Sequence, residues 1–183
     1  LSIIVCMKIA LSFALIADKS LDFNQKIEFL NQFEIDGIEI FGQELEKARL
    51  SDSTIKILNK YKENSIHMPN FGIYDASPEC KQWIERIVNK AKLFNVKNLV
   101  FHSHQIQDYK HIFQKRFISA IENAPDGKKK IGLQTVEENK KLLENHKGLK
   151  LVFDPTHALV NSIMPKDFLS LKDYIISVQL SGI

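Results

Sequence analysis

Residues 77–104 contain one helix and the strand that follows it, in the sequence SPECKQWIERIVNKAKLFNVKNLVFHSH. Up to Phe94, apolar residues recur at i, i+3, i+4, i+7 and i+10, which is the spacing of one buried helical face. Ser77 suits the N-cap and Pro78 the first helical position, because proline lacks the N–H that a first turn leaves unpaired. The mostly apolar run at 98–101 is typical of a strand buried on both faces of a parallel sheet.

The same alternation of apolar runs and helical segments continues along the chain. Further strands are predicted at 8–16, 37–41, 65–68, 130–136, 149–153 and 175–180. Further helices are predicted around Ile27, Leu30 and Phe33; around Ile55, Leu58 and Tyr61; around Phe113, Phe117, Ala120 and Ile121; and over 137–146, ended by Gly148 in a left-handed turn. Repeated strand–helix units give a barrel or an open doubly wound sheet. No GxGxxG follows a strand, so a parallel TIM-like (β/α) barrel, incomplete at about seven strands, is favoured.

Length and composition are those of one globular domain. The chain has 183 residues, of which 44% are hydrophobic and 26% charged, which excludes a disordered or collagen-like chain. An eight-unit barrel typically has roughly 250 residues, so one incomplete barrel domain is expected over 7–183. The six residues before Met7 are expected to be a start-site extension.

Charge and cysteine content indicate the cellular compartment and the kinds of partner to expect. The net charge of +3 is spread along the chain and only residues 128–130 form a lysine run, so a nucleic-acid surface is weakly indicated. Cys6 and Cys80 fit neither a disulfide framework nor a zinc knuckle. The apolar opening at 1–6 is too short for a membrane span. The expected environment is the cytoplasm, without a membrane partner.

Polar side chains gather at the predicted strand ends, where barrels of this type carry their active groups. They are Glu39, His67, His102, His104, Gln134, Asp154, His157 and Gln179. Imidazoles and carboxylates from different strands are ligands that zinc, manganese or iron prefer. Each residue also has a structural alternative: His67 as a hydrogen-bonded rim residue, His104 as a loop residue, and Asp154 as a cap of backbone N–H groups. Their joint placement is what favours a metal site.

Several stretches at these positions resemble the xylose-isomerase-like barrels. This superfamily includes sugar isomerases and epimerases and the endonuclease IV type of abasic-site endonuclease (AP endonuclease family 2). The matching stretches run in family order over nearly the whole chain from Met7. They are DGIEI at 36–40, IHMP at 66–69, LVFH at 99–102, IGLQT at 131–135 with EN at 138–139, FDPTHA at 153–158 and SVQLS at 177–181.

The resemblance implies a role for each matching residue. In the endonuclease-like branch, histidines matching His67 and His102 bind one metal, the aspartate matching Asp154 a second, and the histidine matching His157 a third. A glutamate at the place of Gln134 bridges two metals there and is a principal ligand in the sugar-converting branch. The strand-eight glutamate is missing too. A neutral amide replaces an anionic bridge poorly, so the sequence predicts a reduced site with at most about one zinc or manganese ion per chain.

Two classes of function remain open. The first is a metal-dependent isomerase or epimerase of a sugar or sugar phosphate, with Glu39 as replacement base and Gln134 at the usual glutamate position; phosphodiester hydrolysis at an abasic site is a related variant. The second is a catalytically degenerate, metal-free member that binds a small molecule or a protein, which Gln134 and Gln179 favour. A homodimer or a partner chain would cover the open edge of the barrel, unless the first and seventh strands meet.

Overall fold

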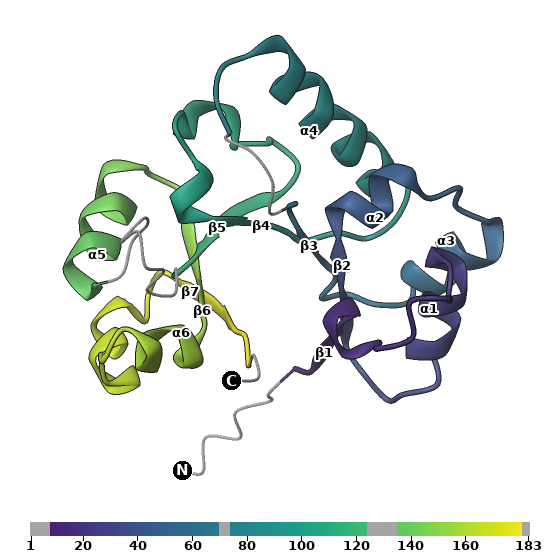
Figure 1. Cartoon of the computed structure of the whole chain (residues 1–183), viewed down its shortest axis with the longest axis horizontal. Coiled ribbons are helices and arrows are strands. Elements are labelled where there is room, and N and C mark those ends of the chain that lie inside the picture. The colour runs from purple at the N-terminus through teal and green to yellow at the C-terminus, as the bar shows by residue number, and fades with distance from the viewer. Residues whose placement is uncertain (1–7, 70–73, 124–134, 181–183) are drawn as a thin grey trace. The chain divides into compact units, whose positions relative to one another are not determined.

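The computed structural model describes residues 8–69, 74–123 and 135–180 (Figure 1). Seven strands form one sheet in the sequential order β1 to β7. Their bounds are β1 Ala10–Ser12, β2 Gly37–Phe41, β3 Ser65–His67, β4 Asn98–His102, β5 Ile118–Glu122, β6 Lys150–Phe153 and β7 Ile175–Val178. The registered pairs β1–β2, β2–β3, β5–β6 and β6–β7 are parallel.

Helices connect the strands along the described chain. The α-helices are α1 Phe23–Leu30, α2 Gly42–Lys47, α3 Asp52–Leu58, α4 Pro78–Ala91, α5 Val136–Asn145 and α6 Pro155–Val160. Short 3₁₀ helices are η1 Phe13–Leu15, η2 Ser103–Gln105, η3 Tyr109–His111 and η4 Pro165–Leu171. Seven parallel strands with intervening helices are the incomplete TIM-like α/β barrel that the sequence predicts, and this fold class is confirmed.

The fifth strand is not where the sequence predicts it. β5 is Ile118–Glu122, inside the segment for which helical spacing from Phe113 to Ile121 predicts a helix, so that helix prediction is wrong. Four of the five β5 residues are buried, because a central strand of a parallel sheet is covered on both faces. A run that is apolar on both faces has no period of its own, so chance matches to helical spacing mislead. Residues 130–134 lie outside the described residues, and α5 begins at Val136.

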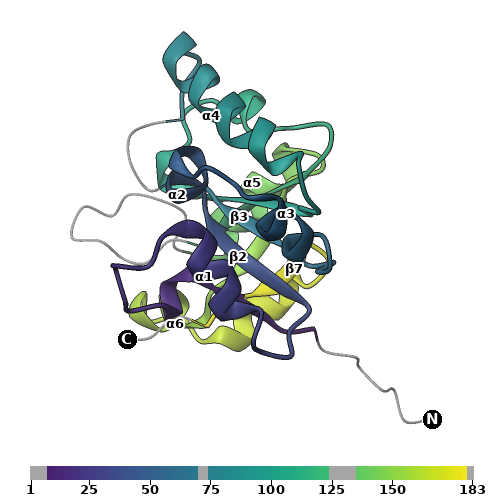
Figure 2. The same ribbon diagram turned by 90° about the vertical axis from the view of Figure 1, so that its right-hand side faces the viewer.

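The chain divides into two compact units, and the first contains Leu1–His67 with Gln82–Asn98. Its core joins Ile38 and Ile40 of β2 to Ile27 of α1 and Leu58 of α3, all fully buried. Figure 2 shows α1 and α3 beside β2. The predicted first strand is shorter than expected, because the chain turns into η1 after Ser12, whose hydroxyl accepts a hydrogen bond from the Ala14 N–H.

Buried polar groups tie the strands and loops of the first unit together. The Asn64 side chain accepts a hydrogen bond from the Ile38 N–H at 2.9 Å and donates to the carbonyls of Leu58 and Asn95 at 2.8 and 2.7 Å. One asparagine therefore hydrogen-bonds backbone groups of β2, of α3 and of the segment after α4.

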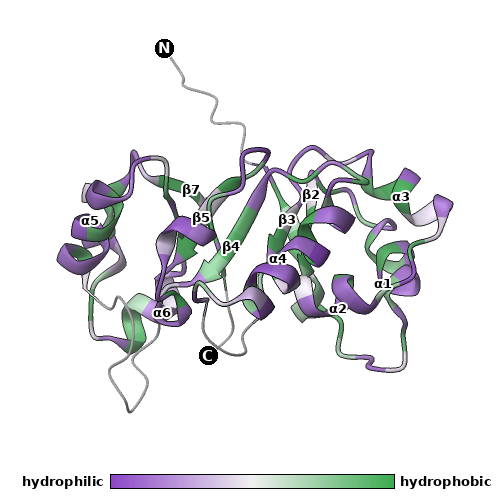
Figure 3. Ribbon diagram, turned by 90° about the horizontal axis from the view of Figure 1, so that it is seen from above, coloured by the Kyte–Doolittle hydropathy of each residue, from purple (hydrophilic) through white to green (hydrophobic). Residues whose placement is uncertain are grey.

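The second unit contains Met68–Lys81 and Leu99–Ile183. Val100, Ala120 and Val152 pack together across β4, β5 and β6, and Ile176 of β7 covers them. In Figure 3 the strand β4 is coloured as hydrophobic, whereas α5 shows both hydrophobic and hydrophilic residues. This pattern is that of helices with one face on the sheet and the other in water.

Helix boundaries follow the local signals in the sequence. The Ser77 hydroxyl accepts a hydrogen bond from the Cys80 N–H and α4 begins at Pro78, which confirms the predicted start of this helix. Thr135 and Glu138 form a capping box at the start of α5. Gly148 has a φ of 94°, so the predicted left-handed turn after α5 is also confirmed. None of the helices in the described ranges combines the length and the apolar character that a membrane crossing requires.

Candidate metal site at the ends of β4, β5 and β6

Three neighbouring strands of the second unit end in ionisable side chains. His102 is the last residue of β4, Glu122 is the last residue of β5, and Asp154 directly follows β6. β5 and β6 run parallel with Glu122 opposite Val152, so their carboxyl ends lie at the same edge of the sheet. Barrels of this architecture carry their active groups at this edge.

Glu122 is the acidic group between two imidazoles. Its side chain is 3% exposed. Its Oε1 lies 3.0 Å from His157 Nδ1, and its Oε2 lies 3.4 Å from His102 Nε2. A carboxylate removed from water needs partners of this kind, since burying an isolated charge is costly.

Asp154 is fully buried and acts first as a helix cap. Its Oδ1 accepts hydrogen bonds from the N–H groups of Thr156 at 2.7 Å and His157 at 3.1 Å, at the start of α6. The predicted capping alternative is therefore correct for one of its oxygens. The other oxygen, Oδ2, is buried and has no hydrogen-bond partner within the described residues.

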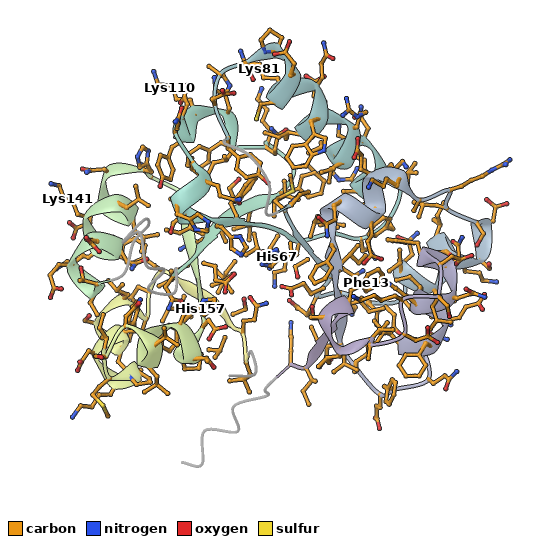
Figure 4. All side chains as sticks on the ribbon, in the orientation of Figure 1. Phe13, His67, Lys81, Lys110, Lys141 and His157 are labelled. Atoms are coloured by element: carbon orange, nitrogen blue, oxygen red, sulfur yellow. The ribbon has the colours of Figure 1, made fainter. Side chains whose placement is uncertain are left out.

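His157 extends from α6 to the end of β5 (Figure 4). Its Nδ1 lies 2.9 Å from the backbone carbonyl oxygen of Asn123, and its Nε2 lies 3.8 Å from Asp154 Oδ2. Burial by itself would lower the pKa of His157. The hydrogen bond and charge of Glu122, helped by Asn123 and Asp154, outweigh burial and raise that pKa overall.

The ring of the exposed His104 packs against the ring of His102. The rings of His102 and His104 stack with centroids 5.4 Å apart and planes at 16°. Desolvation and the neighbouring His102 lower the pKa of His104, although Glu122 acts in the opposite direction. His104 lies in the short helix η2 after β4, as the loop alternative predicts.

The donor set fits a divalent cation. One ligand atom from each of Glu122, Asp154 and His157 can be chosen so that all three lie within 4.8 Å of one another. Ligand atoms at roughly 2.0–2.2 Å from a tetrahedral zinc are about 3.3–3.6 Å apart, so shifts of about 1 Å would bring the three atoms together. The buried Asp154 Oδ2 is the strongest indication, because it has no hydrogen-bond partner among the described residues and a cation would compensate its charge.

The other residues selected from the sequence are placed by their strands. His67 ends β3 and Glu39 lies buried in β2, both in the first unit. Gln134 lies outside the described residues. Gln179 follows β7, and its backbone N–H donates to the Phe153 carbonyl at 2.9 Å.

The sequence reasoning missed Glu122, the residue at the centre of the site. The carboxylate predicted to be missing from strand five is present, because β5 is Ile118–Glu122 and ends in Glu122. A signal for it exists: an apolar run ends in Glu122-Asn123 and is followed by Ala-Pro-Asp-Gly, a turn composition typical of the end of a strand.

Comparisons with known proteins identify the fold. No protein-family model and no curated protein matches the chain. Solved structures show that the chain has the xylose-isomerase-like TIM-barrel fold, as the resemblance implies.

A crystal structure of D-psicose 3-epimerase in the presence of D-fructose has a TM-score of 0.70 at 14% identity, over 96% of this chain and 73% of that one. The probable 3-DHS dehydratase AsbF from Bacillus anthracis has a TM-score of 0.70 at 16% identity, over 94% of this chain and 72% of that one. The apo 3-keto-D-glucoside 4-epimerase YcjR from E. coli has a TM-score of 0.62 at 14% identity, over 96% of this chain and 79% of that one. At these identities the likeness establishes the fold alone.

Proposed function

We propose that this chain is a divalent-metal-dependent enzyme that isomerises or epimerises a sugar or a sugar phosphate. One observation carries the proposal: a buried glutamate and a buried aspartate, one of whose oxygens has no hydrogen-bond partner among the described residues, meet imidazoles at the strand ends of a TIM-like barrel. Perturbed ionisable groups gathered at this edge are typical of catalytic sites. Two of the structurally similar proteins named above, D-psicose 3-epimerase and 3-keto-D-glucoside 4-epimerase, act on sugars by their names, which favours a sugar substrate.

Glu122, Asp154 and His157 would hold the metal, with His102 as a further ligand, and one zinc or manganese ion per chain is the most that we expect. When bound, such an ion polarises the carbonyl and hydroxyl oxygens of a sugar. Both carboxylates are buried, so their charges are poorly screened by water and act strongly on a cation.

The remaining assignments come from the sequence. His67 ends β3 and would be another ligand. Glu39 is the proposed base that moves the proton of the substrate. Cys80 is a free thiol, in keeping with the reducing cytoplasm that we propose.

Metal analysis followed by a substrate screen tests the proposal. Protein purified without chelator should contain up to one zinc or manganese ion per chain, and His102→Ala and His67→Ala should each lower this content. A screen of ketoses and their phosphates, with manganese or zinc added, should reveal epimerisation as exchange of a substrate C–H proton with deuterated water. Absence of both metal and exchange would refute the enzyme.

The second candidate is a binding protein that has lost catalysis. Gln179, half-buried after β7, favours it, because an amide there can hydrogen-bond a ligand but cannot transfer its proton. A screen that finds sugar binding without turnover would select this candidate. Cleavage of a duplex with an abasic site would instead select the phosphodiesterase variant.

A further inference from the structure

Asn123 connects the ends of β5 and β6 through its side chain. Its Oδ1 accepts a hydrogen bond from the Asp154 N–H at 2.7 Å, and its Nδ2 donates to the Asp154 carbonyl at 2.9 Å. Asn123 is 1% exposed, so water does not compete for these bonds. The backbone N–H of Asp154 can only donate and its carbonyl can only accept, so the amide has one possible orientation.

The backbone of Asn123 acts on the neighbouring histidine. Its carbonyl oxygen lies 2.9 Å from His157 Nδ1. A carbonyl has no proton to give, so this hydrogen bond requires a proton on Nδ1. Glu122 Oε1, 3.0 Å from the same nitrogen, is a second acceptor for that proton. Neutral His157 therefore carries its single proton on Nδ1, and its lone pair is on Nε2.

The geometry points to Asn123 as a positioning residue that holds His157 in its Nδ1–H tautomer beside Asp154. This inference rests on the proposed function, because its purpose is to present Nε2 and Asp154 Oδ2, 3.8 Å apart, to one cation. The same residue fixes both groups: the side chain holds the backbone of Asp154, and the main chain holds the ring of His157.

The same hydrogen bonds leave one ligand atom available on each of Asp154 and His157. Asp154 Oδ1 is used by the cap of α6, so Oδ2 is the oxygen left for a cation. The Nδ1 of His157 is used by Asn123 and Glu122, so Nε2 is its only ligand atom. Histidine ligands are commonly oriented in this way, by a hydrogen bond from the nitrogen that does not face the metal.

The first test needs only the metal-free wild-type protein. Long-range ¹⁵N–¹H spectra of ¹⁵N-histidine-labelled protein, recorded at a pH where His157 is neutral and assigned with His157→Gln, distinguish the two tautomers. We expect the Nδ1–H tautomer. The Nε2–H tautomer would overturn the inference, whether or not the protein binds any metal.

The second test measures zinc affinity by competition with a chelator. Asn123→Ala should weaken zinc binding about 10–100-fold, the usual effect of removing a residue that orients ligands. The matched control is Ser119→Ala, which removes another buried hydrogen bond of β5, from the Ser119 hydroxyl to the Ile112 carbonyl at 2.7 Å. This control should bind zinc like the wild type.

Each outcome separates the inference from the proposed function. If Asn123→Ala binds zinc as tightly as the wild type, or if Ser119→Ala loses as much affinity, the side chain of Asn123 has no positioning role even though the metal site stands; the main-chain contact with His157, which alanine keeps, is tested by the tautomer. If the wild type binds no zinc, the proposed function fails, and the tautomer then decides the inference by itself. If Asn123→Ala does not fold, the wild-type tautomer again decides.

Discussion

Replacing Glu122 with glutamine removes one charge from the candidate site and preserves its shape. The side chain is 3% exposed and faces His157 Nδ1 at 3.0 Å and His102 Nε2 at 3.4 Å. Glutamine keeps the length of the side chain and one carbonyl oxygen, but it is a neutral and weak ligand. Glu122→Gln should therefore weaken metal binding without leaving a cavity.

The expected size follows from linkage between binding and folding. At zinc concentrations about 100 times the dissociation constant, binding stabilises the wild type by about 2.7 kcal/mol. For a chain of this length that corresponds to a rise in Tm of roughly 5–11 °C. If the lost anionic ligand weakens binding at least about 100-fold, the variant gains only about 0.4 kcal/mol at the same zinc concentration, or roughly 1–2 °C.

Thermal unfolding with and without zinc measures the difference, each protein being compared with its own metal-free Tm. Glu144→Gln is the matched control, since this carboxylate of α5 is exposed and lies 3.9 Å from Lys140. The control should keep the full zinc-dependent rise. A Glu122→Gln protein that gains as much Tm from zinc as the wild type would refute the assignment of Glu122 as a ligand.

Three further predictions concern the stability of the scaffold. Gly37→Ala should lower the free energy of unfolding by roughly 1–3 kcal/mol, because a Cβ there would lie 2.5 Å from the carbonyl carbon of Glu63; denaturant titration that shows no loss would contradict the packing. Gly148→Ala should lower the free energy of unfolding by about 1–2 kcal/mol, because a φ of 94° is strained for alanine although the added Cβ contacts no other atom within 4 Å. Gly148→Asn should lower it less, because asparagine adopts the left-handed region more readily. Burial alone would raise the pKa of Glu63, but hydrogen bonds and charges from Lys8 and Lys97 lower it overall, so Glu63→Gln should cost at most about 1 kcal/mol at neutral pH. That contribution exists above the unfolded pKa of 4.5 and disappears as pH falls through the lower folded value, so a cost that persists at pH 2 would contradict the ion pairs.

Most of the fold could be predicted because its signals are local. The strands from β2 to β4, β6 and β7 overlap the predicted apolar runs, and α4 begins at the predicted Pro78. Caps, glycine turns and helical faces act over a few residues, so a single sequence reveals them. β5 was misplaced because a short strand buried on both faces has no period that distinguishes it from a helix segment.

The candidate site was predicted in part. His102, Asp154 and His157 were selected from the sequence, and the structure brings them together in the second unit. Glu122 was missed because its selection depends on the position of β5. A glutamate at the end of a predicted helix is expected at the surface, whereas a glutamate at the end of a barrel strand is a candidate site residue. Because β5 was misplaced, the candidate site was predicted with one carboxylate too few.

The sequence by itself determined that parallel strands alternate with helices and that imidazoles and carboxylates stand at the strand ends, because both follow from residue order and short-range preferences. Only the tertiary structure decided that Glu122 lies between His102 and His157, and that one oxygen of Asp154 is buried without a hydrogen-bond partner among the described residues. These facts depend on the pairing of strands distant in the chain, and no local preference encodes that pairing.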